Sequence, residues 1–254
     1  MPRKSLGQNF LYDQAILKQL IQCAEISQED IVVEIGPGPG TLTKMLAQKS
    51  KKVIAIELDA MLFKKLKTDF SETKNIELVQ GDVLKFPFGS IGNFKVVANI
   101  PYYITTPIIF KLLEARDCLK TMTLTIQKEV AERIVAKPGK KDYGVLSIMV
   151  QYYARPELKF IISRKSFRPA PRVDSAVVHF TILERPSVQV KDEKLFFKVV
   201  RTAFSKRRKT LSNSLKSLAE NIKDILIVCG IDPKRRPETL SLDDFTRLSD
   251  LLGK

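Results

Sequence analysis

The sequence has one histidine, three cysteines and no tryptophan among its 254 residues. The cysteines, Cys23, Cys118 and Cys229, are far apart and odd in number, which argues against a disulfide framework and against a zinc site. The single histidine, His179, lies in the alternating run SAVVHFTIL and is expected to be an ordinary sheet residue. Mechanisms built on a Ser-His-Asp triad or on a two-histidine metal centre are therefore disfavoured, and no metal is expected.

Long apolar runs and a leader-like start are also missing. No apolar stretch reaches the length that spans a bilayer, and residues 1–4 lead into polar residues rather than into the apolar core of a signal peptide. The expected location is the cytoplasm. Acidic residues are scarce as well, because 28 Asp and Glu stand against 43 Lys and Arg, for a formal charge of +15. This excess predicts a polyanionic partner, such as nucleic acid or an anionic membrane surface.

The first part of the chain alternates apolar strands with amphipathic helices, the pattern of an α/β fold with helices on both faces of a parallel sheet. Asp13 is expected to cap the first helix. Strands are predicted at residues 31–35, 53–57, 76–80, 94–99, 122–127, 145–153, 158–162 and 175–183. The proline-rich stretch between the last two is expected to be an exposed loop.

The strand signal stops near residue 184, and the remaining residues have a helical pattern. One apolar face runs from Leu195 to Phe204, and Leu211, Leu215 and Leu218 continue it in a second helix. The pattern predicts one domain over residues 1–184 and a small helical domain over residues 185–254.

The helical domain is the more basic part of the chain for its length, with 16 Lys and Arg against 9 Asp and Glu. Its densest cluster, Lys206-Arg207-Arg208-Lys209, is a candidate for contacts with RNA phosphates. A solvated charged face is the alternative interpretation of this cluster.

A glycine-rich loop follows the first predicted strand, in VVEIGPGPGTLTKML. Gly36, Gly38 and Gly40 let the backbone turn sharply and let a ligand approach where a Cβ atom would collide. The spacing is G-x-G-x-G rather than the dinucleotide spacing G-x-G-x-x-G, and its prolines remove N–H donors that a pyrophosphate would use. The loop therefore favours an uncharged or cationic ligand.

Acidic residues end the next two strands. Glu57 ends VIAIELD, where a carboxylate can accept hydrogen bonds from both hydroxyls of a ribose. Asp82 follows the next strand in ELVQGDVLKF and is placed to accept a hydrogen bond from an adenine amino group. Each alone is a common surface carboxylate. Together with the glycine loop they mark three successive strand ends, where ligands of open α/β sheets bind.

The fourth strand ends in Asn99-Ile100-Pro101-Tyr102. The Asn99 side-chain oxygen and the Ile100 backbone carbonyl can accept hydrogen bonds from the amino group of an adenine. Pro101 stiffens the turn, and Tyr102 can stack on the base. A plain turn is the alternative interpretation of these four residues.

In combination these motifs resemble the ribosomal RNA adenine dimethyltransferases, in their KsgA/RsmA branch. The glycine loop, Glu57 and Asp82 look like the S-adenosylmethionine site of Rossmann-like methyltransferases, and Asn99-Ile100-Pro101-Tyr102 looks like their N6-adenine motif. The start SLGQNFLYD, the loop SFRPAPRVDSAVV and the tail FSKRRKTLSNSLK are similar to the same branch. The resemblance covers essentially the whole chain.

The resemblance implies a Rossmann-like class I methyltransferase sheet, mostly parallel with an antiparallel C-terminal strand, and a small helical domain that binds RNA. It implies S-adenosylmethionine as cofactor, enclosed with help from Asn9 and Leu11 and contacted by Asn99. Phe167 is implied to cover the other face of the target base. The implied reaction dimethylates N6 of two adjacent adenosines, in a hairpin loop near the 3′ end of small-subunit rRNA, within an assembling subunit and by a monomer.

Two alternatives stay open at this point. A large-subunit rRNA methyltransferase of the macrolide-resistance type shares the motifs of the first domain, although the tail RRKTLSNSLK argues against it. A nucleic-acid-binding protein with the same fold would act by occupancy alone, although the intact Asn99, Glu57 and Asp82 argue for catalysis.

Overall fold

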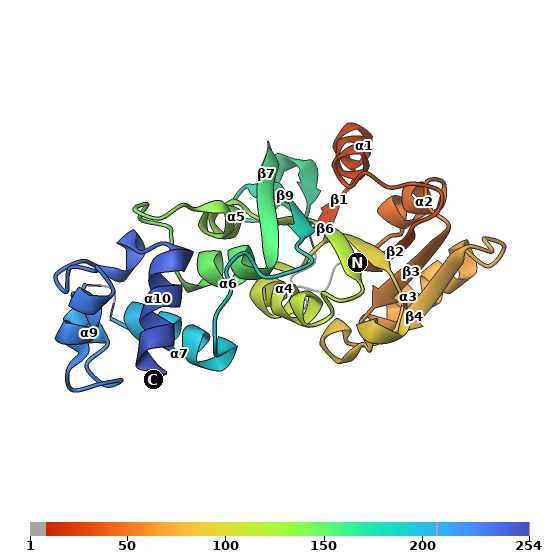
Figure 1. Ribbon diagram of the computed structural model, residues 1–254. Helices are drawn as coiled ribbons and strands as arrows, with labels where there is room; N and C mark the ends of the chain where they lie inside the picture. The colour runs from red at the N-terminus through yellow and green to blue at the C-terminus, as the bar shows by residue number, and fades with distance from the viewer. Residues whose placement is uncertain (1–8, 207, 254) are drawn as a thin grey trace. The chain divides into compact units, whose positions relative to one another are not determined.

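The computed structural model describes residues 9–206 and 208–253, which form two compact units (Figure 1). Unit 1 consists of the residues up to 131 and of residues 156–182, and unit 2 consists of residues 132–155 and of those from 183 onward. Arg207 and the first four residues of the motif SLGQNFLYD lie outside the described residues.

Unit 1 is built on a seven-stranded sheet with the strand order β4-β3-β2-β5-β6-β9-β7. The strands are β2 (Ile31–Ile35), β3 (Lys52–Glu57), β4 (Ile76–Gln80), β5 (Phe94–Asn99), β6 (Leu119–Gln127), β7 (Ala154–Ile162) and β9 (Ser175–Ile182). The first five strands of this order, β4, β3, β2, β5 and β6, are parallel to their neighbours. Strand β9 is antiparallel to β6. The predicted α/β fold, mostly parallel with an antiparallel C-terminal strand, is confirmed.

Helices cover this sheet because its strands are apolar on both faces. Every residue of β3 after Lys52 is buried, as expected of a parallel strand between two helical layers. The helices are α1 (Gln14–Cys23), α2 (Thr41–Ala47), α3 (Ala60–Asp69) and α4 (Thr105–Glu114), with the short 3₁₀ turns η2 (Val83–Lys85), η3 (Phe88–Ser90), η4 (Tyr102–Ile104) and η5 (Arg164–Ser166). Helix α5 (Lys128–Val135) carries the chain from unit 1 into unit 2.

The predicted cap of the first helix is confirmed. The Asp13 carboxylate Oδ1 accepts hydrogen bonds from the backbone N–H groups of Ala15, at 2.9 Å, and of Ile16, at 3.3 Å. These bonds satisfy two of the donors that a helix leaves free at its start. Leu17 and Leu20 of this helix are fully buried in the core of unit 1.

A second, two-stranded sheet joins parts of unit 1 that are far apart in the sequence. Strand β1 (Phe10–Leu11) is antiparallel to β8 (Phe167–Arg168), and the pairs are Phe10 with Arg168 and Leu11 with Phe167. The side chains of Leu11 and Phe167 are buried in the core of the unit. This pairing attaches the start of the described chain to the loop that precedes β9.

Unit 2 is helical and has its own core. Its helices are α6 (Val145–Tyr153), α7 (Glu193–Phe204), α8 (Leu211–Ser214), α9 (Ile222–Val228) and α10 (Leu242–Leu252), with the turn η6 (Pro237–Thr239). In Figure 1, α7, α9 and α10 are the cyan to blue helices. Aromatic rings fill the core: the centroid of Tyr152 lies 5.2 Å from that of Phe196 and 5.1 Å from that of Phe197.

The strand predicted at residues 145–153 is wrong, because this segment is α6. Its run VLSIMVQYY is apolar on almost every side, so periodicity cannot distinguish a buried helix from a buried strand. The backbone N–H of Gly144 donates to the Ser147 hydroxyl at 3.0 Å at the start of the helix. The segment belongs to unit 2. We predicted that residues 1–184 form one domain, whereas the structure groups residues 132–155 of that range with the helical unit.

The second helix of the tail is also shorter than predicted. Helix α8 ends at Ser214, with Leu215 as its C-cap and Leu218 in the following turn. The polar residues in its single turn favour caps and turns over helix interiors. All three leucines of the predicted face nevertheless contribute to the core of unit 2.

Candidate active site

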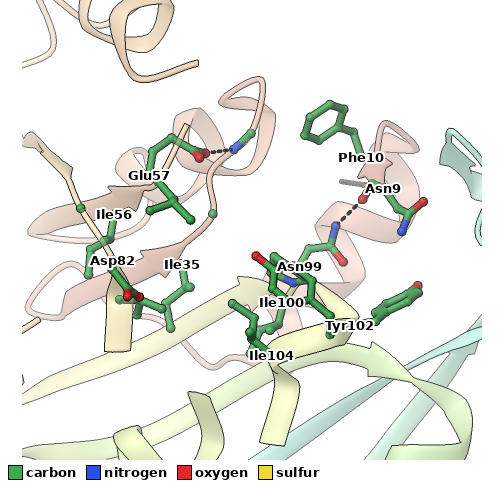
Figure 2. Close-up of a pocket in the computed structure, with 17 residues that line it drawn as sticks. Asn9, Phe10, Ile35, Ile56, Glu57, Asp82, Asn99, Ile100, Tyr102 and Ile104 are labelled. Atoms are coloured by element: carbon green, nitrogen blue, oxygen red, sulfur yellow. Dashed lines mark hydrogen bonds between the residues drawn. The ribbon is translucent and has the colours of Figure 1, made fainter. Parts of the chain in front are cut away.

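A cleft of about 750 Å³, including the solvent at its mouth, opens at the carboxyl ends of β2, β3, β4 and β5. This size is typical of small-molecule sites. Figure 2 shows Ile35, Ile56, Glu57 and Asp82 along one side and Asn9, Phe10, Asn99, Ile100 and Tyr102 along the other. The cleft lies where the order of the parallel strands changes direction, between β2 and β5, which is the usual ligand position in such sheets.

The glycine loop follows β2, and its residues Gly36 and Gly38 line the cleft. Gly36 and Gly38 have φ angles of +67° and +56°, in the region that other residues rarely adopt. A Cβ atom on Gly38 would lie 2.7 Å from Cε1 of Phe10, whereas no described atom lies within 4 Å of the corresponding position on Gly36. The loop therefore leaves open space at Gly36 and packs closely against the N-terminal segment at Gly38.

Glu57 is held in place at the end of β3. Its Oε2 accepts a hydrogen bond from the Gly38 backbone N–H at 3.2 Å, drawn in Figure 2, and its Oε1 accepts one from the Asp59 N–H at 2.8 Å. Burial raises the pKa of the carboxyl, and these two N–H donors oppose that shift. A carboxylate offers about four acceptor sites, so the group can still accept a hydrogen bond from a ligand hydroxyl.

Asp82 lies beside Glu57, because Gly81 before it donates its backbone N–H to the Glu57 carbonyl at 3.0 Å. The Asp82 side chain caps the turn η2 through a bond of 2.9 Å from the Leu84 N–H to Oδ1. One acceptor is thus used to fix the carboxylate, and others remain for a ligand in the cleft.

A buried acid that the sequence did not mark as a site residue lies in the strand before the glycine loop. Glu34 is 2% exposed, and its Oε2 has no hydrogen-bond partner among the described residues. Burial, with a smaller effect from the negative charge of Glu57, raises the pKa of the Glu34 carboxyl to about 8. The only signal in the sequence was a charged residue inside the apolar run IVVEI.

Asn99 ends β5 with a defined amide orientation. Its Nδ2 donates to the backbone carbonyl of Asn9 at 2.9 Å, the second hydrogen bond drawn in Figure 2. The side-chain Oδ1 is therefore the end of the amide that can accept a hydrogen bond from a ligand. The next residue is fixed as well, since the Ile100 N–H donates to the Thr125 carbonyl at 3.1 Å and its side chain is 1% exposed.

The hydroxyl of Tyr102 is held by a hydrogen bond. Its hydroxyl lies 2.5 Å from Oγ of Ser175, the first residue of β9. Burial raises the pKa of Tyr102, so the phenol stays neutral near pH 7. The next residue, Tyr103, also lines the cleft and is 56% exposed. Ser175 stands in the motif quoted for the family resemblance, but nothing in the sequence pointed to its contact with Tyr102.

The structure brings most of the predicted site residues to the one cleft. Those that line it are Asn9, Gly36, Gly38, Glu57, Asp82, Asn99, Ile100, Pro101 and Tyr102. Leu11 instead borders a smaller cavity beside the glycine loop, together with Glu34. Of the basic cluster, Lys206, Arg208 and Lys209 are exposed in unit 2 after the end of α7, and Arg207 is not described.

Phe167 does not lie where we expected it. Its ring is 2% exposed and packs in the core of unit 1, and it does not line the cleft. The pairing of β8 with β1 accounts for this position, because it places Phe167 opposite the buried Leu11. The structure therefore does not place this ring at the cleft, and its role as a cover for the target base stays a prediction.

The single histidine lies in the sheet and does not line the cleft. His179 is a sheet residue, as predicted; it is buried, and its Nδ1 lies 2.9 Å from the hydroxyl of Thr123. Within residues 9–206 and 208–253, no group of three or more His, Cys, Asp and Glu side chains is arranged to hold a metal ion. In the same part of the chain, every helix is too short or too polar to cross a membrane.

Comparison with known proteins gives a consistent result. The chain matches the model of the family described as ribosomal RNA adenine dimethylase over residues 2–254. It is 50% identical to a protein named ribosomal RNA small subunit methyltransferase A from Clostridium botulinum (strain Loch Maree / Type A3), over 98% of this chain and 93% of the relative. A protein of the same name from Clostridium acetobutylicum is 49% identical, over 97% of this chain and 92% of the relative.

Two solved structures share the fold over nearly the whole chain. A dimethyladenosine transferase from Plasmodium falciparum has a TM-score of 0.79 and 31% identity, and the match covers 94% of this chain and 95% of that one. The 23S rRNA methyltransferase ErmE has a TM-score of 0.76 and 28% identity, with coverage of 97% and 100%. Since the family model and relatives of about half identical sequence both cover nearly its full length, the chain belongs to the ribosomal RNA adenine dimethylase family.

Proposed function

We propose that this chain is an S-adenosylmethionine-dependent enzyme that converts adenosine of small-subunit rRNA into N6,N6-dimethyladenosine. The observation that carries the proposal is the meeting of Glu57, Asp82 and Asn99 at one cleft, in a chain of the ribosomal RNA adenine dimethylase family. Two carboxylates suited to a nucleoside face an amide suited to an adenine amino group across that cleft (Figure 2).

The cofactor side of the cleft fits S-adenosylmethionine. The Glu57 carboxylate would accept hydrogen bonds from the ribose hydroxyls, and Asp82 from the adenine amino group, while Ile35 and Ile56 provide an apolar wall. The open space at Gly36 admits a ligand close to the backbone. When bound, the cofactor supplies an electrophilic methyl group.

The other side of the cleft positions the nucleophile. The exocyclic nitrogen of adenine is weakly nucleophilic because its lone pair is delocalised into the ring. Asn99 Oδ1 and the Ile100 carbonyl would accept hydrogen bonds from its two protons and so fix the direction of the lone pair. The bond from Asn99 Nδ2 to Asn9 holds the amide in the orientation that this requires.

The Tyr102 ring would stack on the target base, which contributes about 1–3 kcal/mol per base in comparable sites. The bond to Ser175 restricts how that ring can move. The methylated amine is acidic while it still carries its extra proton, and it can lose that proton to water or to a carbonyl. No basic side chain is therefore required, which agrees with a cleft whose described lining contains no histidine.

The target adenosine has to be accessible in its RNA. The reactive nitrogen is hidden in a duplex, so the substrate adenosine must lie in a loop or be flipped out. We place the reaction on two adjacent adenosines in a hairpin loop near the 3′ end of the small-subunit rRNA, in an assembling subunit. The exposed Lys206, Arg208 and Lys209 of unit 2 would contact its phosphates.

Transfer of labelled methyl groups tests the proposal. Small subunits that lack the modification are incubated with the protein and labelled S-adenosylmethionine, and nuclease digests are mapped by mass spectrometry. Labelled N6,N6-dimethyladenosine at two adjacent positions is expected. Large-subunit RNA is incubated in the same way as a second substrate, because the chain is also similar to the 23S rRNA methyltransferase ErmE. Label only on large-subunit RNA would transfer the proposal to that substrate, and no label on either RNA would contradict it.

A further inference from the structure

The loop that precedes β9 is strongly basic. Residues 163–174, with the sequence SRKSFRPAPRVD, contain four basic side chains and one acidic one. The basic residues are Arg164, Lys165, Arg168 and Arg172, and all four are exposed. The excess of three positive charges lies on unit 1, so it is additional to the basic cluster of unit 2.

These charges are not neutralised by neighbouring acids. In the described part of the chain, none of the four basic side chains forms a salt bridge. The one acidic residue, Asp174, uses Oδ1 to accept the backbone N–H of Arg164 at 2.9 Å. The Arg164 Nη1 also donates to the Arg172 carbonyl, at 3.4 Å. These bonds close the loop on itself and leave it with a net charge of +3.

The loop is attached to the cleft at two points. Arg168 pairs with Phe10, which lines the cleft, and Ser175 directly after the loop is hydrogen-bonded to Tyr102, which lines it too. Tyr102 belongs to the side of the cleft proposed to hold the target base. The four charges thus lie on a loop whose two attachments are residues next to the reacting nucleotide.

We propose that Arg164, Lys165, Arg168 and Arg172 form a phosphate-binding surface for the RNA strand that flanks the target adenosine. The inference rests on the proposed function and names a contact surface for its substrate. An adenosine inserted in the cleft leaves its own backbone at the mouth, where guanidinium groups can bind phosphate oxygens in pairs. Such contacts hold the strand in register and carry no sequence information themselves.

A matched pair of variants separates this role from a general effect of charge. The loop variant carries Arg164→Gln, Lys165→Gln, Arg168→Gln and Arg172→Gln. The control variant carries the same change at four exposed lysines elsewhere on unit 1, which are Lys49, Lys51, Lys64 and Lys67. Both variants have four fewer positive charges, so net charge is equal. A third variant, with the three loop arginines changed to lysine, keeps the charge and alters the geometry.

Binding is measured by fluorescence anisotropy with a labelled hairpin of the 3′ end of small-subunit rRNA, over a series of KCl concentrations. Removing one phosphate interaction should lower the slope of log K against log salt by about 0.7, which corresponds to roughly fivefold weaker binding at 0.1 M salt. The loop variant should show this decrease for two or more phosphates. The control and lysine variants should keep the slope of the unmodified protein.

Equal slopes for the loop and control variants would overturn the inference. Binding of S-adenosylmethionine, measured by calorimetry, confirms that each variant is folded. The two proposals fail in different ways: if the unmodified protein methylates neither RNA, the proposed function fails, whereas normal methylation with an unaltered slope in the loop variant removes only the phosphate surface.

Discussion

The two sides of the cleft hold their polar groups by different means. On the side formed by the ends of β2, β3 and β4, the cofactor side, Glu57 and Asp82 are fixed by backbone N–H groups of the strand-end turns and loops around them. On the other side, the base side, Asn99 is bonded to Asn9, 90 positions earlier, and Tyr102 to Ser175, 73 positions later.

This difference indicates that one side binds the cofactor and the other orients the target base. Carboxylates fixed by nearby turns form a preorganised site for one small ligand. The amide on the base side depends on Asn9, directly before β1, and the ring depends on Ser175 of β9. Their orientation therefore depends on distant parts of unit 1 being in place. Substitutions on the cofactor side should therefore change cofactor affinity or local stability, and those on the base side should change the rate of methyl transfer.

The largest expected effect is on the cofactor side, at Glu34. Burial raises the pKa of this carboxyl from 4.5 to about 8 in the folded protein. Its contribution to stability is therefore complete below about pH 4.5 and is lost as the pH rises through about 8. The free energy of unfolding should fall across this window by up to about 5 kcal/mol through this group.

Glu34→Gln should flatten that fall, and urea unfolding at a series of pH values measures it. Glu29→Gln, the same substitution at an exposed position, is the control. A constant difference between Glu34→Gln and the unmodified protein over the whole pH range would mean that Glu34 does not titrate in this window.

Phe167→Ala has the next largest effect and tests the base side. A buried phenylalanine replaced by alanine destabilises a protein by about 3–5 kcal/mol. Tyr103→Ala, at a ring that is 56% exposed, should change stability far less. Thermal and urea unfolding compare the two. Unaltered stability of Phe167→Ala together with a loss of methylation would show that this ring acts on the target base and not in the core.

Gly38→Ala probes the contact between the two sides, because this glycine packs against Phe10. The positive φ angle alone makes alanine unfavourable by about 1–2 kcal/mol, and the new Cβ would also collide with the Phe10 ring. We expect roughly tenfold weaker cofactor binding, the equivalent of about 1.4 kcal/mol. Gly89→Ala, where no described atom lies within 4 Å of the added Cβ, is the matched control for calorimetry.

Ser175→Ala should have the smallest effect. It removes a single hydrogen bond from the Tyr102 hydroxyl, and such bonds contribute about 0.5–1.5 kcal/mol. The rate of methyl transfer should fall a few-fold while cofactor affinity stays the same. Tyr102→Phe removes the same bond from the other side, so the double variant should be no slower than either single one. Additive losses in the double variant would show that the two hydroxyls act independently.

The cofactor side could be predicted from the sequence because its residues stand directly at the ends of successive strands. Glycines, Glu57 and Asp82 recur at intervals that the strand pattern makes visible. The base side could be predicted only in part. Asn99 to Tyr102 form a local motif, but the partners Asn9 and Ser175 are brought to them by strand pairing, for which a single sequence has no local signal.

Segments buried on most sides account for the other errors. Residues 145–153 form a helix in a core, and the run lacks the polar face that would mark its period. Phe167 stands among prolines and basic residues, which is typical of an exposed loop, yet its pairing with Leu11 buries it. In both cases the neighbouring residues in the sequence do not show which side chains the segment packs against in the fold.

The central claim is that one side of the cleft binds the cofactor and the other positions the nucleophile. The most direct measurement compares Glu57→Ala with Asn99→Ala, using calorimetry for S-adenosylmethionine binding and mass spectrometry for methyl transfer at saturating cofactor. Glu57→Ala should weaken binding by roughly 1.5–3 kcal/mol, since the cofactor loses a charged acceptor. Asn99→Ala should bind the cofactor normally and transfer methyl groups about 100- to 1,000-fold more slowly. Normal dimethylation by Asn99→Ala would contradict the account.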